Sequence, residues 1–242
     1  NNKAMRKRFG IQGMTALLAL AMVFSFRADT HGYRELFNRI NAHLSPAQDH
    51  YVASTYAMYR DSLGGSAVQK LQVEKWKAGA SEVIKTGLMD IYREANRQLI
   101  VDYESRIIAL GPLSGNMDWT RGYAVYLDSM LSRCHLKVLQ NTASTSTLQV
   151  NYPPRVPISA SLLVYDHNTY VPKRATIFSK VPQAISQDDW AISPRIEISY
   201  DLIEIREVKL PDDMGKYLEE VDGEYILKER YQDFEFLNQL ND

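Results

Sequence analysis

The sequence predicts an α+β fold in which a single N-terminal transmembrane helix, a helical stalk and further helices precede an antiparallel β-sheet domain. Three observations support this fold class. Residues 9–26 carry no charge, apolar residues recur every three or four positions in much of the chain up to residue 138, and apolar and polar residues alternate in several segments after residue 147. Helices first and strands afterwards are typical of an α+β domain.

The uncharged segment 9–26 has the length of a membrane-spanning helix. As a helix its eighteen residues span ~27 Å, close to the ~30 Å hydrocarbon thickness of a bilayer. Gly10, Gly13 and Ala16 have small side chains, which allow a second helix to approach closely. These three residues are therefore predicted to contact a partner within the membrane.

Charge is distributed unevenly along the chain. Residues 1–27 hold five basic residues and no acidic one, whereas residues 211–242 hold ten acidic residues against three basic ones. The positive-inside rule then predicts a single-pass inner-membrane protein with its N-terminus inside and the bulk of the chain in the periplasm or the mitochondrial intermembrane space. The nearly neutral middle lacks the basic stripe that nucleic-acid binding requires, so nucleic acid is not an expected partner.

Two other interpretations of the N-terminal segment stay open. It has the charged start and apolar stretch of a cleavable signal peptide, with Ala19 and Ala21 placed as the small residues of a cleavage site. It also has the composition of a buried core helix. An amphipathic helix lying in the membrane interface is excluded, because apolar residues surround the segment on every side.

Five parts follow from these patterns: a basic cytoplasmic tail (1–8), the transmembrane helix (9–26), a helical stalk (27–63), an extracytoplasmic α+β domain (64–210) and an acidic C-terminal hairpin or tail (211–242). Apolar spacing predicts four helices beyond the membrane segment, at residues 33–44, 52–63, 66–99 and 118–138, and alternation makes a strand the competing prediction for 123–138. Gly64 and Gly65 are predicted to end the second helix, and Gly79 and Gly87 to weaken the third.

The second half of the chain has the composition of strands. Alternating apolar residues predict strands at 148–152, 158–165, 170–178 and 195–210. Two short segments, 216–221 and 224–228, flank Asp222 and Gly223, a dipeptide that favours the type I′ turn of a β-hairpin. The sequence does not decide whether residues 211–242 dock on their own domain or on a partner.

No motif for a chemical reaction is present. His31, His43 and His50 lack accompanying ligands at metal-binding spacing, and Cys134 has the neighbours of a buried apolar residue. The glycines do not form a phosphate-binding loop, and no G-x-S-x-G elbow occurs. The acidic pair Asp212 and Asp213 is interpreted as part of a solvated charge run. We therefore predict no enzyme, no catalytic residues, no cofactor and no metal.

Aromatic residues provide the second predicted contact surface. The chain has fifteen tyrosines against seven phenylalanines, and tyrosine is enriched at protein interfaces. Four aromatic residues of the acidic tail are difficult to bury in a small hairpin alone and are predicted to bind a partner: Tyr225, Tyr231, Phe234 and Phe236.

The predicted layout resembles that of scaffold subunits in bacterial envelope machines, such as those of type IV secretion systems. It implies a non-enzymatic, bitopic subunit that scaffolds a multi-protein inner-membrane complex. The expected partners are other protein subunits, membrane lipid and, as a further option, copies of the same chain. Two alternatives remain: an accessory subunit of a mitochondrial inner-membrane complex, and a membrane-tethered enzyme whose site is assembled from scattered residues.

Overall fold

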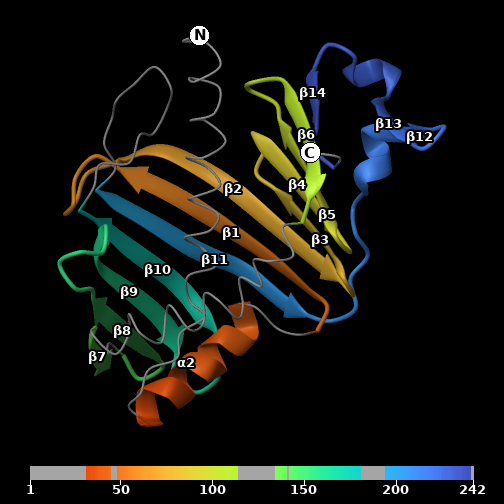
Figure 1. Ribbon diagram of the computed structural model, residues 1–242. Coiled ribbons are helices and arrows are strands. Elements are labelled where there is room, and N and C mark those ends of the chain that lie inside the picture. The colour runs from red at the N-terminus through yellow and green to blue at the C-terminus, as the bar shows by residue number, and fades with distance from the viewer. Residues whose placement is uncertain (1–30, 45–47, 114–133, 141, 181–193, 241–242) are drawn as a thin grey trace. The chain divides into compact units, whose positions relative to one another are not determined.

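A computed structural model describes residues 31–44, 48–113, 134–140, 142–180 and 194–240 (Figure 1). In these residues the chain forms strands β1 to β14 and a single α-helix, α2 (His31–Leu44). The chain divides into two compact units. The first takes its described residues from 1–47, 53–71 and 118–203, and the second takes its own from 48–52, 72–117 and 204–242. Strands β1 (His50–Tyr59), β2 (Ala67–Ala78) and β11 (Arg195–Ile205) contribute residues to both.

The first unit is a sheet with the strand order β2-β1-β11-β10-β9-β8-β7, in which neighbours from β11 to β7 pair antiparallel. Its other strands are β7 (His135–Gln140), β8 (Thr145–Asn151), β9 (Ile158–Asp166) and β10 (Pro172–Ser179). Leu148, Leu163 and Ile198 are fully buried in it. Helix α2 lies against β10 and buries Phe37 and Ile40, which share one helix face because they are three residues apart.

The second unit carries the strand order β14-β6-β5-β4-β3-β2-β1. Its further strands are β3 (Ser81–Lys85), β4 (Met89–Glu94), β5 (Arg97–Asp102), β6 (Ile107–Pro112) and β14 (Glu235–Asn238). Neighbours from β2 to β6 pair antiparallel, and β14 joins the outer side of β6 in parallel. A separate two-stranded hairpin consists of β12 (Leu218–Val221) and β13 (Glu224–Leu227), with the short 3₁₀ turns η1 (Met214–Lys216) and η2 (Glu229–Tyr231) on either side.

The C-terminal segment belongs to the core of the second unit. Met214, Tyr217 and Leu218 are buried in the same apolar cluster as Leu99 and Ile108 of the sheet. The pairing of β14 with β6 shows the same docking, because it adds residues 235–238 to the edge of the sheet. Residues 211–240 therefore pack on their own unit, and binding of a partner by the same segment stays a prediction.

Several predicted elements are confirmed. Helix α2 coincides with the helix expected at 33–44, and β8, β9, β10 and β11 lie at the four expected strands, although β11 ends at Ile205. The β12–β13 hairpin turns at Asp222 and Gly223, whose φ angles of 53° and 83° are both positive, as a type I′ turn requires.

The helical half of the predicted fold class is wrong. Residues 52–63, expected as a helix of the stalk, lie largely in β1, where alternate residues such as Val52, Ser54 and Tyr56 are buried. Their apolar spacing fits both periods, but their β-branched and aromatic side chains favour a strand. Residues 66–99 form β2 to β5 instead of one long helix.

Two glycines explain why residues 66–99 form strands instead of the expected helix. Gly79 and Gly87 have φ angles of 57° and 77°, and they form the turns that connect β2 to β3 and β3 to β4. At the second turn the Thr86 hydroxyl accepts hydrogen bonds from the amides of Leu88 and Met89. Glycines that look like weak points of a helix are therefore the residues that reverse the chain between strands.

The membrane prediction is also corrected. Residues 9–26 lie outside the described residues, as does most of the helix expected at 118–138, whose last residues begin β7. Among the residues that the structure describes, no helix is both long and apolar enough to cross a membrane. The expected placement as a single-pass inner-membrane protein is not retained.

Gly87→Ala distinguishes the strand structure from the expected helix. We expect this substitution to lower the free energy of unfolding by about 1 kcal/mol, because alanine is strained at φ 77° although space for its Cβ is free. Inside a helix the same change would stabilise by about the same amount. Urea unfolding measures the difference. The control is Gly111→Ala in β6, where φ is not positive and the new Cβ makes ordinary contacts, so no loss is expected.

Candidate functional site

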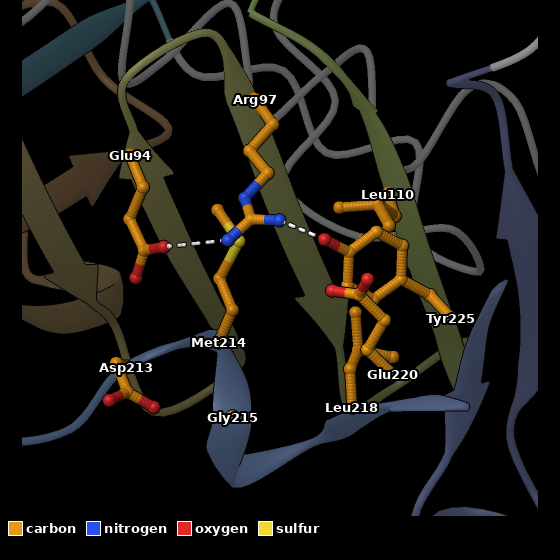
Figure 2. A pocket seen from close by; sticks show the side chains of 9 residues that line it. All are labelled: Glu94, Arg97, Leu110, Asp213, Met214, Gly215, Leu218, Glu220 and Tyr225. Carbon is orange, nitrogen blue, oxygen red and sulfur yellow. Dashed lines mark hydrogen bonds and ion pairs between the residues drawn. The ribbon is translucent and has the colours of Figure 1, made fainter. Parts of the chain in front are cut away.

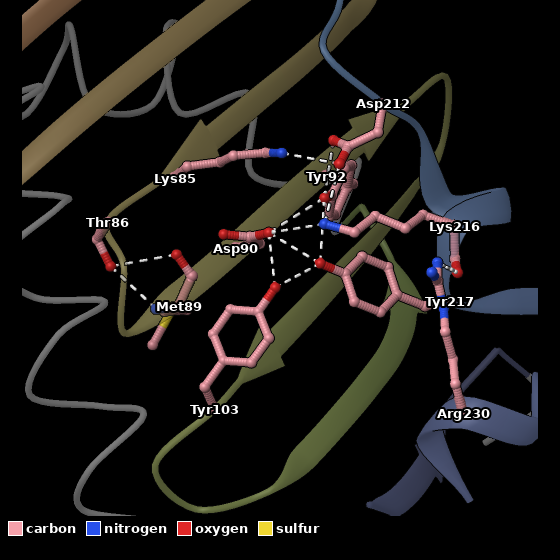
Figure 3. Close-up of polar contacts among 10 residues, drawn as sticks. All are labelled: Lys85, Thr86, Met89, Asp90, Tyr92, Tyr103, Asp212, Lys216, Tyr217 and Arg230. Atoms are coloured by element: carbon pink, nitrogen blue, oxygen red, sulfur yellow. Dashed lines mark hydrogen bonds and ion pairs between the residues drawn. The ribbon is translucent and has the colours of Figure 1, made fainter.

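A buried carboxylate joins the C-terminal segment to the sheet of the second unit. Asp90 lies in β4 with 4% of its surface exposed. Its Oδ2 atom accepts hydrogen bonds from the hydroxyls of Tyr103 and Tyr217, both at 2.8 Å, and the hydroxyl of Tyr92 lies 3.2 Å from it (Figure 3). Three phenols from β4, the β5–β6 turn and the C-terminal segment thus converge on one oxygen.

A second carboxylate extends this network toward solvent. Asp212 Oδ2 lies 2.8 Å from Lys85 Nζ and 3.0 Å from Lys216 Nζ, and its Oδ1 accepts a hydrogen bond of 2.9 Å from Tyr92. Lys216 also approaches Asp90 at 3.7 Å. Two carboxylates therefore face two ammonium groups, and the partly buried charges balance.

The phenols of this network act as hydrogen-bond donors. Burial raises the pKa of Tyr92, Tyr103 and Tyr217 well above the ordinary value, and the nearby Asp90 carboxylate raises them further. Burial alone would raise the pKa of Asp212 as well, but its hydrogen bonds with Lys85, Lys216 and Tyr92 hold that pKa below the usual range. Protonated phenols facing an ionised carboxylate stabilise the docked segment and are poor bases or nucleophiles.

A pocket of about 280 Å³ lies beside the network, beneath the hairpin (Figure 2). Residues of β4, β5, β6, η1 and the two hairpin strands line it: Glu94, Arg97, Leu110, Asp213, Met214, Gly215, Leu218, Glu220 and Tyr225. Three of these are carboxylates and one is a guanidinium, so the lining carries a net charge of −2.

The guanidinium of Arg97 is already engaged within the pocket wall. It donates a short hydrogen bond to the Tyr225 hydroxyl, lies 5.3 Å from the centre of the Tyr225 ring and pairs with Glu94 Oε2 at 3.4 Å. By contrast, Asp213 and Glu220 have no ion-pair partner among the residues that the structure describes. Negative charge is therefore in excess in the pocket.

The register of the hairpin separates two chemically different faces. Leu218 pairs with Leu227 and Glu220 with Tyr225, which puts these residues on the inner face that borders the pocket. On the outer face Glu219 pairs with Ile226 and Val221 with Glu224. Val221 and Ile226 are 46% and 41% exposed. The outer face thus combines exposed apolar side chains with carboxylates.

The structure distributes the seven predicted contact residues between three places. Gly10, Gly13 and Ala16 lie outside the described residues. Tyr225 lines the pocket. The rings of Tyr231 and Phe234 pack against each other and against Tyr217 and Tyr103, and Phe236 lies in β14 opposite Ile108. All four tail aromatics pack against the core of their own unit, and their role toward a partner stays a prediction.

The network residues were missed by sequence reasoning. Asp90 stands between Met89 and Ile91 in a strand that is buried on both faces, and an acidic residue in such a position signals a buried partner. The charge pattern predicts a solvated Asp212, yet its side chain is only 20% exposed. Within the described residues no three metal-ligating side chains come together as a metal site.

No protein-family model matches this sequence, and no curated protein matches it. Solved structures show a limited likeness. An uncharacterised conserved protein from Thermus thermophilus aligns over 86% of this chain and 99% of its own, with 7% identity and a TM-score of 0.47. A LolA superfamily protein from Nitrosomonas europaea aligns over 72% of this chain and 94% of its own, with 9% identity and a TM-score of 0.31.

A third structure is the complex of MucA and MucB from Pseudomonas aeruginosa. It aligns over 70% of this chain and 56% of its own, with 12% identity and a TM-score of 0.41. All three TM-scores lie below 0.5, so the likeness assigns neither a fold family nor a function. The function must be inferred from the chain's own residues.

Tyr217→Phe tests the network directly. We expect a loss of about 1–3 kcal/mol in the free energy of unfolding, because the buried Asp90 carboxylate loses a donor while the ring stays in place. Tyr51→Phe is the matched control in the same unit. Its hydroxyl bonds the exposed carboxylate of Glu74, which water can solvate instead, so a loss within about 0.5 kcal/mol is expected. Equal losses in chemical denaturation would contradict the special role of Tyr217.

Proposed function

We propose that this chain is a non-enzymatic protein-binding subunit and that it contacts its partner through the outer face of the β12–β13 hairpin. The observation that carries the proposal is the pairing of exposed Val221 and Ile226 with Glu219 and Glu224 on one small surface. Apolar side chains provide affinity by leaving water, and charges provide orientation and choice of partner.

The position of the hairpin supports this proposal. In Figure 1 β12 and β13 project from the sheet strands of their unit. The base of the hairpin is fixed: Leu218 is buried, the Lys228 amide bonds the Tyr217 carbonyl at 2.9 Å, and Arg230 bonds the Lys216 carbonyl at 2.8 Å. A rigid element loses little conformational entropy on binding, which favours affinity.

The chemistry of the surface favours a partner segment with basic and apolar residues. Glu219, Asp222 and Glu224 surround the exposed apolar pair without a basic residue between them in β12, the turn or β13. Opposite charge accelerates association and excludes acidic segments. The narrower expectation of a subunit in a secretion-type machine stays a prediction.

The non-enzymatic part of the proposal rests on the buried network. Its titratable groups neutralise one another, and its phenols are held protonated, so the network serves to dock the C-terminal segment. The alternative of an enzyme assembled from scattered residues has no specific observation in its favour.

A random peptide library tests the proposed surface. Selection on the purified protein should enrich peptides that combine lysine or arginine with apolar residues, and fluorescence anisotropy should show binding that weakens with salt. Val221→Ser should weaken this binding roughly tenfold, since burial of a valine side chain provides about 1.5 kcal/mol or more. Val68→Ser is the matched control, because Val68 is 43% exposed in the first unit.

Two results would contradict the proposal. One is the absence of any enriched peptide. The other is enrichment of peptides whose affinity is unchanged by Val221→Ser or is reduced equally by Val68→Ser.

A further inference from the structure

We infer that the pocket beneath the hairpin receives one cationic side chain, that of a lysine or an arginine. The inference rests on the proposed function in one respect: the side chain belongs to a bound protein segment. The pocket itself is defined by its lining residues and does not include the outer face of the hairpin.

The charge of the lining selects a cation. Glu94, Asp213 and Glu220 face a single guanidinium, and Arg97 already bonds Glu94 and Tyr225. An anionic ligand would meet the unpaired carboxylates of Asp213 and Glu220, and its charge would be repelled. A positively charged head group would instead supply the ion pair that these two carboxylates lack among the described residues.

The apolar part of the lining selects a side chain with a hydrocarbon stem. Leu110, Met214 and Leu218 provide apolar surface, and the ring of Tyr225 closes one side. Lysine and arginine bury their methylene groups against such surface while the charged end reaches polar groups. A small inorganic cation would leave this apolar surface unused.

The pocket is large enough to hold one side chain. Its volume of about 280 Å³ lies just below the ~300–1,000 Å³ of pockets that hold drug-sized molecules. It is open enough for a side chain to enter from a segment lying along the hairpin, whose strands have no further strand partner in the described part of the chain.

The walls of the pocket are fixed before any ligand binds. Lys228 Nζ donates a short hydrogen bond to the Gly215 carbonyl, and the Tyr217 amide bonds the Met214 carbonyl at 3.0 Å. Met214 and Leu218 are buried in the core cluster. Because the buried network holds η1 in place beside β4, binding requires little rearrangement.

The test uses a free probe, so that it does not depend on the outer face. N-acetyl-lysine methylamide and N-acetyl-arginine methylamide are titrated into the full chain, and the methyl signals of Met214 and Leu218 and the ring signals of Tyr225 are followed by NMR. Saturable shifts at these residues are expected for both probes. The side-chain-acetylated lysine derivative, which has the same stem without the charge, should bind markedly more weakly.

Two adjacent glutamates provide a matched pair of variants. Glu220 borders the pocket and Glu219 lies on the opposite face of the same strand. Glu220→Gln should weaken probe binding about two- to fivefold, the size expected for an ion pair near the surface. Glu219→Gln removes the same charge from the same hairpin and should leave probe binding unchanged.

The outcomes separate this inference from the proposed function. Equal binding of the neutral derivative, an absence of saturable shifts, or equal effects of the two glutamate variants would overturn the inference. If peptides are selected and bind through Val221 while the probes fail, the proposed function stands and the cation pocket does not. If the probes bind while no peptide is selected, the pocket stands and the proposed function fails.

Discussion

One buried carboxylate determines how the second unit is assembled. Asp90 is buried, and an unpaired charge there would cost free energy, so the hydrogen bonds that Tyr103 and Tyr217 donate to it stabilise the unit. Tyr217 is the donor that comes from the C-terminal segment. Docking of this segment therefore stabilises the buried charge in the sheet. The fully buried ring of Tyr217 adds apolar contacts that stabilise the docked segment further. Asp212 and Lys216 extend the coupling, because each ammonium group of the network has a carboxylate within 3.0 Å.

The site depends on this docking. The short 3₁₀ turn η1 and the residue before it place Lys216 in the network and Asp213, Met214 and Gly215 in the pocket wall, so one stretch of four residues serves both. The hairpin follows directly, with Leu218 inserted in the core and Glu220 at the pocket. A segment that composition alone marks as an acidic tail is therefore an ordered element with a buried inner side and an exposed outer side.

The parts of the fold that the sequence predicts correctly are those where a local sequence pattern is compatible with one structure only. Asp222 and Gly223 fix their turn, and the alternation at 158–165 and 195–205 has no helical interpretation. The prediction for residues 50–99 is wrong because apolar residues four apart, such as Val52 and Tyr56, satisfy both the helical and the strand period. Hydrogen bonds to distant strands decide between the two. The site could not be predicted from the sequence for a similar reason. Asp90 and Tyr217 are 127 residues apart, and no local pattern brings them together.

Native-state hydrogen exchange of the C-terminal amides tests the central claim most directly. The amides of Tyr217, Lys228 and Gln239 donate to carbonyls within the second unit, and Gln239 donates to Leu110 of the sheet. If the segment is part of the core, these amides are protected to an extent comparable with the β5 amides and exchange in the same cooperative opening. Exchange at the rate of an unstructured chain, with β5 still protected, would show that the segment does not dock and would contradict both the network and the site built on it.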